Sequence, residues 1–258
     1  MHEHPDVVNL MPPGTYLEVL EHPSGDSSES VEMAIFKEHR FAFYFWNRWT
    51  NKLTGQSAPT LITVDWHRDL APPSGNEKRA LEHLDLSNED KVSEFIWSEL
   101  NTHNDSHLLS AGYLNIIGDI ILLKNYGDPS EDEYRDSFGN RHCIREFKRY
   151  KNFENAVIAD KSKQVYLDLD LDFFIKGKVY SHQTEEVTPY SRDEIAGIIN
   201  PESLLFKHLF RKLEGITIAT EPRYCGGILK SHSILEGVLQ QLLTDEMKWK
   251  HLAQRDTR

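Results

Sequence analysis

The sequence has little cysteine and no long apolar run. Only two cysteines occur, Cys143 and Cys225, far apart and in no C-x-x-C pattern. This spacing argues against a disulfide framework and predicts a reducing compartment. No apolar run approaches the roughly 20 residues that a membrane-spanning helix needs. The first residues, MHEHPDVVNLMPPG, lack the basic and apolar regions of a signal peptide. We therefore expect a soluble, cytoplasmic protein that does not bind membranes.

Positive charge is also scarce. The chain has 29 Lys and Arg against 41 Asp and Glu, a formal net charge of −12. Binding of nucleic acid requires a basic face, so we expect no nucleic-acid partner. An acidic surface would suit a cationic substrate, although an excess of acidic residues more often serves solubility. The 258 residues are 39% hydrophobic, enough for a substantial core, and we expect a single domain over residues 1–258.

Short apolar runs alternate along the chain with segments of helical periodicity. The runs are nearly continuous in apolar residues, which is typical of a parallel sheet covered by helices on both faces. We therefore expect an α/β fold, a three-layer α/β/α sandwich with a mainly parallel central sheet. Strands are expected within 15–22, 31–36, 60–69, 112–128, 163–177 and 215–227, and helices within 37–49, 87–101, 191–200, 201–214 and 232–249.

Three local features allow more specific predictions. Ser87, followed by Asp90 three residues later, predicts a capping box for the helix within 87–101. Pro201 suits the first position of the helix that follows it. The stretch 129–162 is charged, aromatic and rich in turn signals, and we expect it to be a surface insertion or lid.

The segment LITVDWHRD carries the first candidate site. An apolar strand from Leu61 to Val64 runs into Asp65, His67 and Asp69 at alternate positions. Side chains alternate across a strand, so these three would share one face if the backbone stays extended past Val64. Packing gains nothing from two carboxylates and an imidazole side by side, whereas a divalent cation would be bound by them. We therefore predict that the three are metal ligands.

The segment VYLDLDLDFF carries a second acidic motif, Asp168, Asp170 and Asp172. Three ionised carboxylates on one buried face repel one another. A solvated edge strand is the alternative, but the intervening leucines and phenylalanines are too apolar for an edge. A cation would resolve the conflict. Carboxylates with a few imidazoles suit Mn²⁺ better than an all-sulfur or three-histidine zinc site would.

Together these motifs resemble the arginase (ureohydrolase) superfamily. Its members share a three-layer α/β fold and a bridged pair of Mn²⁺ ions. Their signatures are a D-x-H-x-D motif at one strand end, a D-x-D motif at a later one, and an isolated upstream histidine. Asp65, His67 and Asp69 match the first motif, and Asp170 and Asp172 match the second.

Three further residues take their roles from this resemblance. His39 in FKEHRFAF matches the upstream histidine, and Asp168 stands where the family usually has a serine beside the ligands. Glu221 in ITIATEPRY follows the last strand and precedes a proline, as does the glutamate with which arginases bind the substrate guanidinium. A carboxylate there can take the planar guanidinium through paired, charge-assisted hydrogen bonds.

The resemblance also implies which residues bind each metal ion and which residue transfers a proton. Two Mn²⁺ ions per chain would be bridged, and the reaction would release urea and leave an ornithine side chain. Asp69 would also help to pass a proton to the leaving amine. The implied ligands are Asp65 and Asp170 for both ions, His39 and Asp69 for one ion, and His67 and Asp172 for the other.

The family has in addition a histidine on a loop that shuttles protons. His103 and His107 in NTHNDSHLLSAG are the candidates, and we favour His107 narrowly. For either one, an exposed histidine without a role is the alternative.

The chain departs from the family in ways that point to the substrate. The glycine-rich lead-in to the upstream histidine is missing, and DFF replaces the usual D-x-x-D-P ending. These variants resemble the branch that contains the peptide arginases, which convert arginine to ornithine in ribosomally made precursor peptides. The loop LAPPSGNEK after Asp69 also does not resemble the polar, Asn- and Ser-rich loop with which the family holds the α-carboxylate of free arginine, and its two prolines have no N–H. We therefore expect an arginine-containing precursor peptide as partner. The aromatic residues expected to line its groove are Tyr134, Phe138, Phe147, Tyr150 and Phe153.

Two other functions stay open. A zinc-dependent, deacetylase-like amidohydrolase of the same broad fold would pair two histidines near its metal, whereas this chain has no His-His dipeptide. In such an enzyme, His39 and Glu221 would also lack a purpose. A non-catalytic binding protein stapled by a metal ion would not need six ligands. The oligomeric state also stays open.

Overall fold

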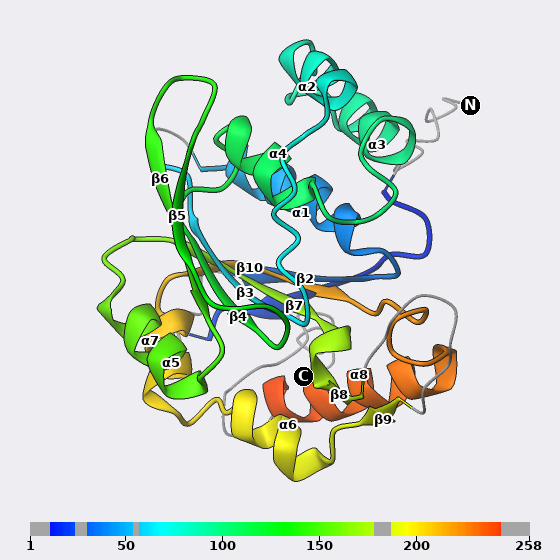
Figure 1. The fold of residues 1–258 in the computed structure, drawn as a ribbon, viewed down its shortest axis with the longest axis vertical. Helices are drawn as coiled ribbons and strands as arrows, with labels where there is room; N and C mark the ends of the chain where they lie inside the picture. The colour runs from blue at the N-terminus through cyan, green and yellow to red at the C-terminus, as the bar shows by residue number, and fades with distance from the viewer. Residues whose placement is uncertain (1–10, 24–29, 54–56, 178–186, 244–258) are drawn as a thin grey trace, which may run out of the picture.

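The computed structural model describes residues 11–23, 30–53, 57–177 and 187–243. Its central sheet has eight strands in the order β1-β2-β10-β7-β3-β4-β6-β5 (Figure 1). The inner strands run parallel, whereas the edge strands β1 and β5 are antiparallel to their neighbours. The strands are β1 (Tyr16–Glu21), β2 (Ser30–Phe36), β3 (Thr60–Asp65), β4 (Ile120–Lys124), β5 (Glu131–Arg135), β6 (Arg141–Phe147), β7 (Val165–Asp170) and β10 (Leu213–Ala219).

Helices cover both faces of the sheet, which confirms the three-layer prediction. Each face has its own apolar core, and the alternating side chains of the inner strands enter one core or the other. No described helix is long and apolar enough to cross a membrane. One face carries α1 (Ala42–Thr50), α2 (Gly75–Glu82), α3 (Glu89–Ser98) and α4 (His107–Tyr113), and the other carries α5 (Tyr150–Ala159), α6 (Arg192–Ile198), α7 (Leu204–Phe210) and α8 (Ile228–Leu242).

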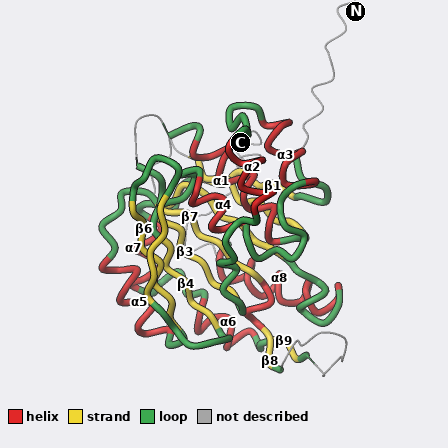
Figure 2. The backbone as a smooth tube through the Cα atoms, turned by 45° about the horizontal axis from the view of Figure 1, so that its top comes forward, coloured by secondary structure: helices red, strands yellow, loops and turns green. Residues whose placement is uncertain are grey.

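Two short 3₁₀ helices and a small hairpin complete the described elements. The 3₁₀ helix η1 (His39–Phe41) follows β2, and η2 (Leu171–Phe174) follows β7 directly. Strands β8 (Ile175–Lys176) and β9 (Thr188–Pro189) pair in a separate antiparallel sheet beside α6 and α8 (Figure 2). Both 3₁₀ helices therefore begin at the carboxyl edge of the central sheet.

Several local predictions are wrong in detail. Helix α3 is capped by Asn88, whose side chain accepts hydrogen bonds from the amides at 90 and 91, and not by Ser87. Ser203 caps α7, and Pro201 lies in the turn before that helix. The strand expected within 163–177 ends at Asp170, because the chain then enters η2. The helix expected up to residue 249 ends at Leu242, and residues 244–249 lie outside the described part.

The stretch 129–162 extends the central sheet. It forms β6, which pairs parallel to β4, the edge strand β5, and helix α5, which packs on α7. Phe153 is buried in the core of that face, with Phe147 and Tyr150 against it. Tyr134 donates a hydrogen bond to the carbonyl of Gly118 over 2.5 Å.

The order of the strands creates a crevice at the carboxyl edge. Strands β3 and β7 are neighbours, but the chain leaves β3 toward the face of α2, α3 and α4 and leaves β7 toward the face of α6 and α7. In parallel sheets, ligands bind where connections diverge in this way. The two acidic motifs lie at this point.

Candidate metal centre

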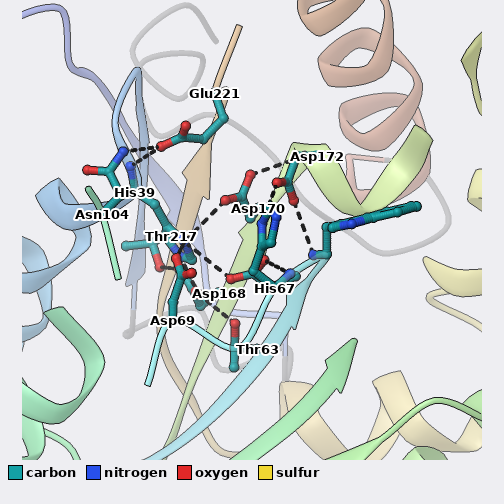
Figure 3. Close-up of polar contacts among 12 residues, drawn as sticks. His39, Thr63, His67, Asp69, Asn104, Asp168, Asp170, Asp172, Thr217 and Glu221 are labelled. Atoms are coloured by element: carbon teal, nitrogen blue, oxygen red, sulfur yellow. Dashed lines mark hydrogen bonds and ion pairs between the residues drawn. The ribbon is translucent and has the colours of Figure 1, made fainter. Parts of the chain in front are cut away.

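His39 lies at the centre of the site, on η1 directly after β2, and is fully buried. Its backbone N–H donates to Oε1 of Glu221 over 2.8 Å. Its ring Nε2 lies 2.8 Å from Oδ2 of Asp168. Its Nδ1 lies 3.2 Å from Oδ2 of both Asp69 and Asp170 (Figure 3). The ring is therefore held from one side and presents its other nitrogen to the carboxylates.

Asp168 is the residue that orients His39. Its Oδ2 accepts a hydrogen bond from the hydroxyl of Thr63 over 2.7 Å, and its Oδ1 accepts one from Thr217 over 2.6 Å. Trp46 donates in turn to the hydroxyl of Thr217 over 3.3 Å. A carboxylate with both oxygens occupied in this way accepts the Nε2 proton of His39. The Nδ1 lone pair is then free for a metal ion.

Asp65 has a buried oxygen that no hydrogen bond satisfies. It is the last residue of β3, and its Oδ1 accepts from the amide of His67 over 2.6 Å. Its Oδ2 has no hydrogen-bond partner and lies 3.5 Å from Nδ1 of His39. Leaving a buried carboxylate oxygen unpaired costs free energy unless a cation takes its lone pairs. The donor set therefore fits a bound metal ion.

Turns, and not extended strands, bring the motif residues together. Strand β3 ends at Asp65, and Asp69 adopts a left-handed conformation with φ of 49°. Asp172 likewise lies on η2, where its Oδ1 accepts from the amide of Trp66 and its Oδ2 lies 3.1 Å from Nδ1 of His67. The expectation that the backbone stays extended past Val64 is therefore wrong, although the side chains of Asp65, His67 and Asp69 do converge.

The side chains form two groups of ligand atoms that share Asp65. Within each group the ligand atoms lie within 4.8 Å of one another. The buried His and Asp cluster could thus bind metal and is compatible with a metal-dependent enzyme. Asp170 belongs to the first group, so its bridging role stays a prediction. The first group is His39, Asp65, Asp69 and Asp170, and the second is Asp65, His67 and Asp172.

Without a bound metal ion, the buried carboxyl groups and histidines of this site hold protons more readily than usual. Burial raises the pKa of the Asp65 and Asp170 carboxyl groups well above their usual range, and neighbouring carboxylates add to the effect. Burial alone would lower the pKa of His67, but Asp172 and the other carboxylates raise it to about 9. The pKa of His39 is raised for the same reason, chiefly by Asp168. A metal ion would displace these protons.

Glu221 stands beside the cluster and is not one of the grouped ligands. It follows β10 with φ of 36°, and its Oε1 accepts from the His39 amide and, over 2.7 Å, from Nδ2 of Asn104. Burial raises the pKa of its carboxyl to about 7. Together with Asp170 and Asp172, Glu221 lines a cavity of about 500 Å³.

The cavity wall comes from the segments that follow β3, β4 and β10, from the end of β7 with η2, and from the loop before α4. The five aromatic residues expected to form a groove within 129–162 do not line it, so that expectation finds no support at this cavity. The lining residues are His67, Arg68, Asp69, Leu70, Ala71, His103, Asn104, Asp105, Tyr126, Asp170, Asp172, Glu221 and Tyr224.

The two candidate loop histidines lie in different places. His103 is exposed on the cavity wall. His107 is the first residue of α4 and is fully buried, with its ring centroid 4.3 Å from that of His39 and 5.8 Å from that of Trp46. Burial lowers its pKa well below the usual value, and neither ring nitrogen has a hydrogen-bond partner. One of its ring nitrogens lies within 4.8 Å of possible ligand atoms of His39 and Asp69.

Sequence reasoning missed the residues that support the ligands. Thr63 and Thr217 are polar residues inside otherwise apolar strands, and that is the only local signal they give. Asn104 gives none, because its partner Glu221 lies 117 residues away.

Comparison with known proteins adds no assignment: no protein-family model and no curated protein sequence matches this chain.

The shared ligand leads to a prediction on metal content. Asp65→Asn keeps the hydrogen bond from the His67 amide but removes a charge from both groups, so we expect metal binding to be lost at both groups. Asp172→Asn should lose metal binding only at the group that contains His67. The measurement is the metal content of each variant after dialysis against Mn²⁺. Asp132→Asn, at an exposed position of β5, is the control. Wild-type loading of the Asp65 variant would contradict the assignment.

The raised pKa values predict how metal stabilisation depends on pH. His67 contributes stability to the metal-free fold that is fully present below about pH 6.5 and is lost as pH rises through about 9. The buried carboxyls act in the same direction, because the folded state holds their protons above the usual carboxyl range. We therefore expect Mn²⁺ to raise the Tm more at about pH 8 than at about pH 6. Thermal unfolding with Mn²⁺ or a chelator tests this, and an equal rise at both pH values would contradict it.

Proposed function

We propose that this chain is a manganese-dependent guanidinium hydrolase that converts arginine side chains, within a peptide, to ornithine with release of urea. Water adds to the guanidinium carbon, the bond from that carbon to the side-chain nitrogen breaks, and the nitrogen leaves as an amine with a proton. The observation that carries the proposal is Glu221, an anchored carboxylate on the same cavity wall as the two ligand groups. The resemblance to arginases, with His39 and the two aspartate motifs, supports it.

Glu221 would bind and orient the guanidinium. Its Oε1 is held by the His39 amide and Asn104, so the carboxylate is fixed before substrate arrives. A guanidinium cation beside it would favour the ionised carboxylate, which burial alone disfavours at neutral pH. Fixing the carbon next to the ligand groups supplies proximity and orientation. Two Mn²⁺ ions would supply Lewis acidity and lower the pKa of a water molecule.

Asp69 and His103 would accept and donate protons during the reaction. The Asp69 side chain is partly exposed and borders the cavity, so it can accept a proton from water and deliver it to the leaving nitrogen. His103 lies on the same wall and is open to solvent, which suits exchange of protons with bulk water. The ring of His107 packs against that of His39, so His107 would instead support the position of the His39 ring.

Two features support a peptide substrate. A cavity of about 500 Å³ has the size of sites for drug-sized ligands and leaves room beyond a guanidinopropyl group. The loop after Asp69 also offers few donors for an α-carboxylate, because Pro72 and Pro73 have no N–H and the Ala71 amide donates to the Asp105 carbonyl over 2.7 Å.

The direct test is release of urea by the Mn²⁺-loaded protein. We expect turnover of a peptide with an internal arginine, faster than that of free arginine, and none by the Asp65→Asn variant. Comparable or higher kcat/KM on free arginine would remove the peptide assignment. Absence of urea from every guanidino compound, with Zn²⁺-dependent release of acetate from an acetyl-lysine peptide, would favour the deacetylase-like alternative.

The role of Glu221 gives a sharper prediction. Glu221→Gln keeps an oxygen to accept from the His39 amide and Asn104 but removes the charge. We expect metal content and Tm to stay at wild-type values, while kcat/KM falls by the equivalent of about 3–5 kcal/mol, since a buried cation loses its partner. Glu133→Gln, at an exposed position of β5, is the matched control. Loss of metal or of folding in the Glu221 variant would make the residue structural and weaken the proposal sharply.

A further inference from the structure

Arg68 lies between the candidate ligands His67 and Asp69 in the sequence, but its side chain reaches Glu146 on β6. Its Nε and Nη2 lie 2.8 and 2.7 Å from the same oxygen, Oε1 of Glu146 on β6. The side chain is 48% exposed, and the residue lines the cavity over the ligand groups. Arg68 is thus held at one end and open to the cavity at the other.

Glu146 cannot fully neutralise the charge of Arg68, because the same carboxylate also pairs with Lys124. Its side chain has no exposure, and its second oxygen forms an ion pair with Nζ of Lys124, which is also buried. Lys124 donates further to the carbonyl of Asp128 over 2.8 Å. Two cations therefore face one carboxylate, and the group Lys124–Glu146–Arg68 carries a net positive charge at the cavity rim.

The rest of the cavity wall is acidic. Among its described lining residues, Arg68 is the only lysine or arginine, against the five acids Asp69, Asp105, Asp170, Asp172 and Glu221. A guanidinium has five N–H donors in a planar fork, and Glu146 engages it through Nε and Nη2 only. The remaining donors suit a carboxylate, which takes such a fork through short, charge-assisted bonds.

We infer that Arg68 binds a carboxylate of the substrate, so that the preferred substrate has an anionic group close to its reacting guanidinium. This inference rests on the proposed function. The carboxylate has two possible sources: the α-carboxylate of an arginine at the C-terminus of a peptide, or the side chain of an aspartate or glutamate beside an arginine in a peptide. In both cases the substrate is bipolar, with its cation at Glu221 and its anion at Arg68.

The test compares substrates that differ only in the carboxylate. One arm pairs a peptide that ends in arginine with the same peptide carrying a C-terminal amide, which lacks the α-carboxylate. The other pairs a blocked peptide with aspartate beside its arginine and the same peptide with asparagine. In at least one arm we expect the wild-type protein to prefer the carboxylate about tenfold to a hundredfold in kcat/KM. The arm with the preference identifies the source.

Three variants show whether Arg68 is the cause. Arg68→Gln should bring the preference close to one by lowering kcat/KM on the substrate that carries the carboxylate, and Arg68→Lys should restore part of the preference. Neither should unfold, because Lys124 still pairs with Glu146. Arg141→Gln, an exposed arginine on β6 paired with Glu133, should behave as wild type. Metal content is measured for each variant.

The outcomes separate this inference from the proposed function. An unchanged preference in Arg68→Gln, or no preference in the wild-type protein, would overturn the inference while the hydrolase stands. If no guanidino compound releases urea, the proposed function fails, and binding of ornithine and putrescine by titration calorimetry then decides. Tighter binding of ornithine that Arg68→Gln abolishes would support the carboxylate site, and equal binding of the two amines would overturn it.

Discussion

The structure depends on a concentration of negative charge in one buried place. Asp65, Asp170 and Asp172 are each at most 3% exposed, and their carboxylates converge at the ends of two adjacent strands. Packing cannot account for this, because like charges in a poorly hydrated site oppose folding. The metal-free chain relieves the repulsion by holding protons, as the raised pKa values of Asp65 and Asp170 indicate. A divalent cation relieves it more completely, and with the charges still available for chemistry.

Asp168 is a buried aspartate that belongs to neither group of ligand atoms. It is as buried as its neighbours, yet Thr63, Thr217 and His39 satisfy both of its oxygens within the protein. The register of the sheet makes this possible, because Thr63 on β3 and Thr217 on β10 both lie opposite Asp168 on β7. One carboxylate of the motif thus serves the orientation of His39, whereas Asp170 and Asp172 each belong to one of the two groups of ligand atoms.

The convergence of the candidate ligands could be predicted from the sequence, whereas the contacts that support them could not. Spacing by two residues brings side chains together in a tight turn as well as on a strand, so Asp65, His67 and Asp69 converge although the assumed backbone was wrong. Parallel topology then brings the end of β3 beside the end of β7. The contacts of Asp168 depend instead on the register of strands 49 and 105 residues apart, which no local pattern encodes.

The edge strand β5 and the long-range ion pairs escaped prediction for a related reason. The strand β5, with the sequence EDEYR, is charged and mostly exposed, so it carries no apolar signal, and the stretch 129–162 reads as an insertion. The pairing of Arg68 with Glu146 follows from the position of β6 beside β4, which the sequence does not reveal. Both features come from the order of strands in the sheet and not from the strands themselves.

Backbone strain around the cavity argues against a purely structural metal site. Four described non-glycine residues have positive φ, and three of them, Asp69, Asn104 and Glu221, line the cavity. Such conformations cost on the order of 1–3 kcal/mol each and persist only where surrounding contacts impose them. A metal staple would explain the strain at Asp69, which belongs to the first group of ligand atoms. It would not explain Glu221, which belongs to neither ligand group, or Asn104, whose contact with Glu221 holds that carboxylate at the cavity. The fold therefore gives up stability to present a carboxylate beside the metal ligands, which a binding site for a cationic substrate requires and a staple does not.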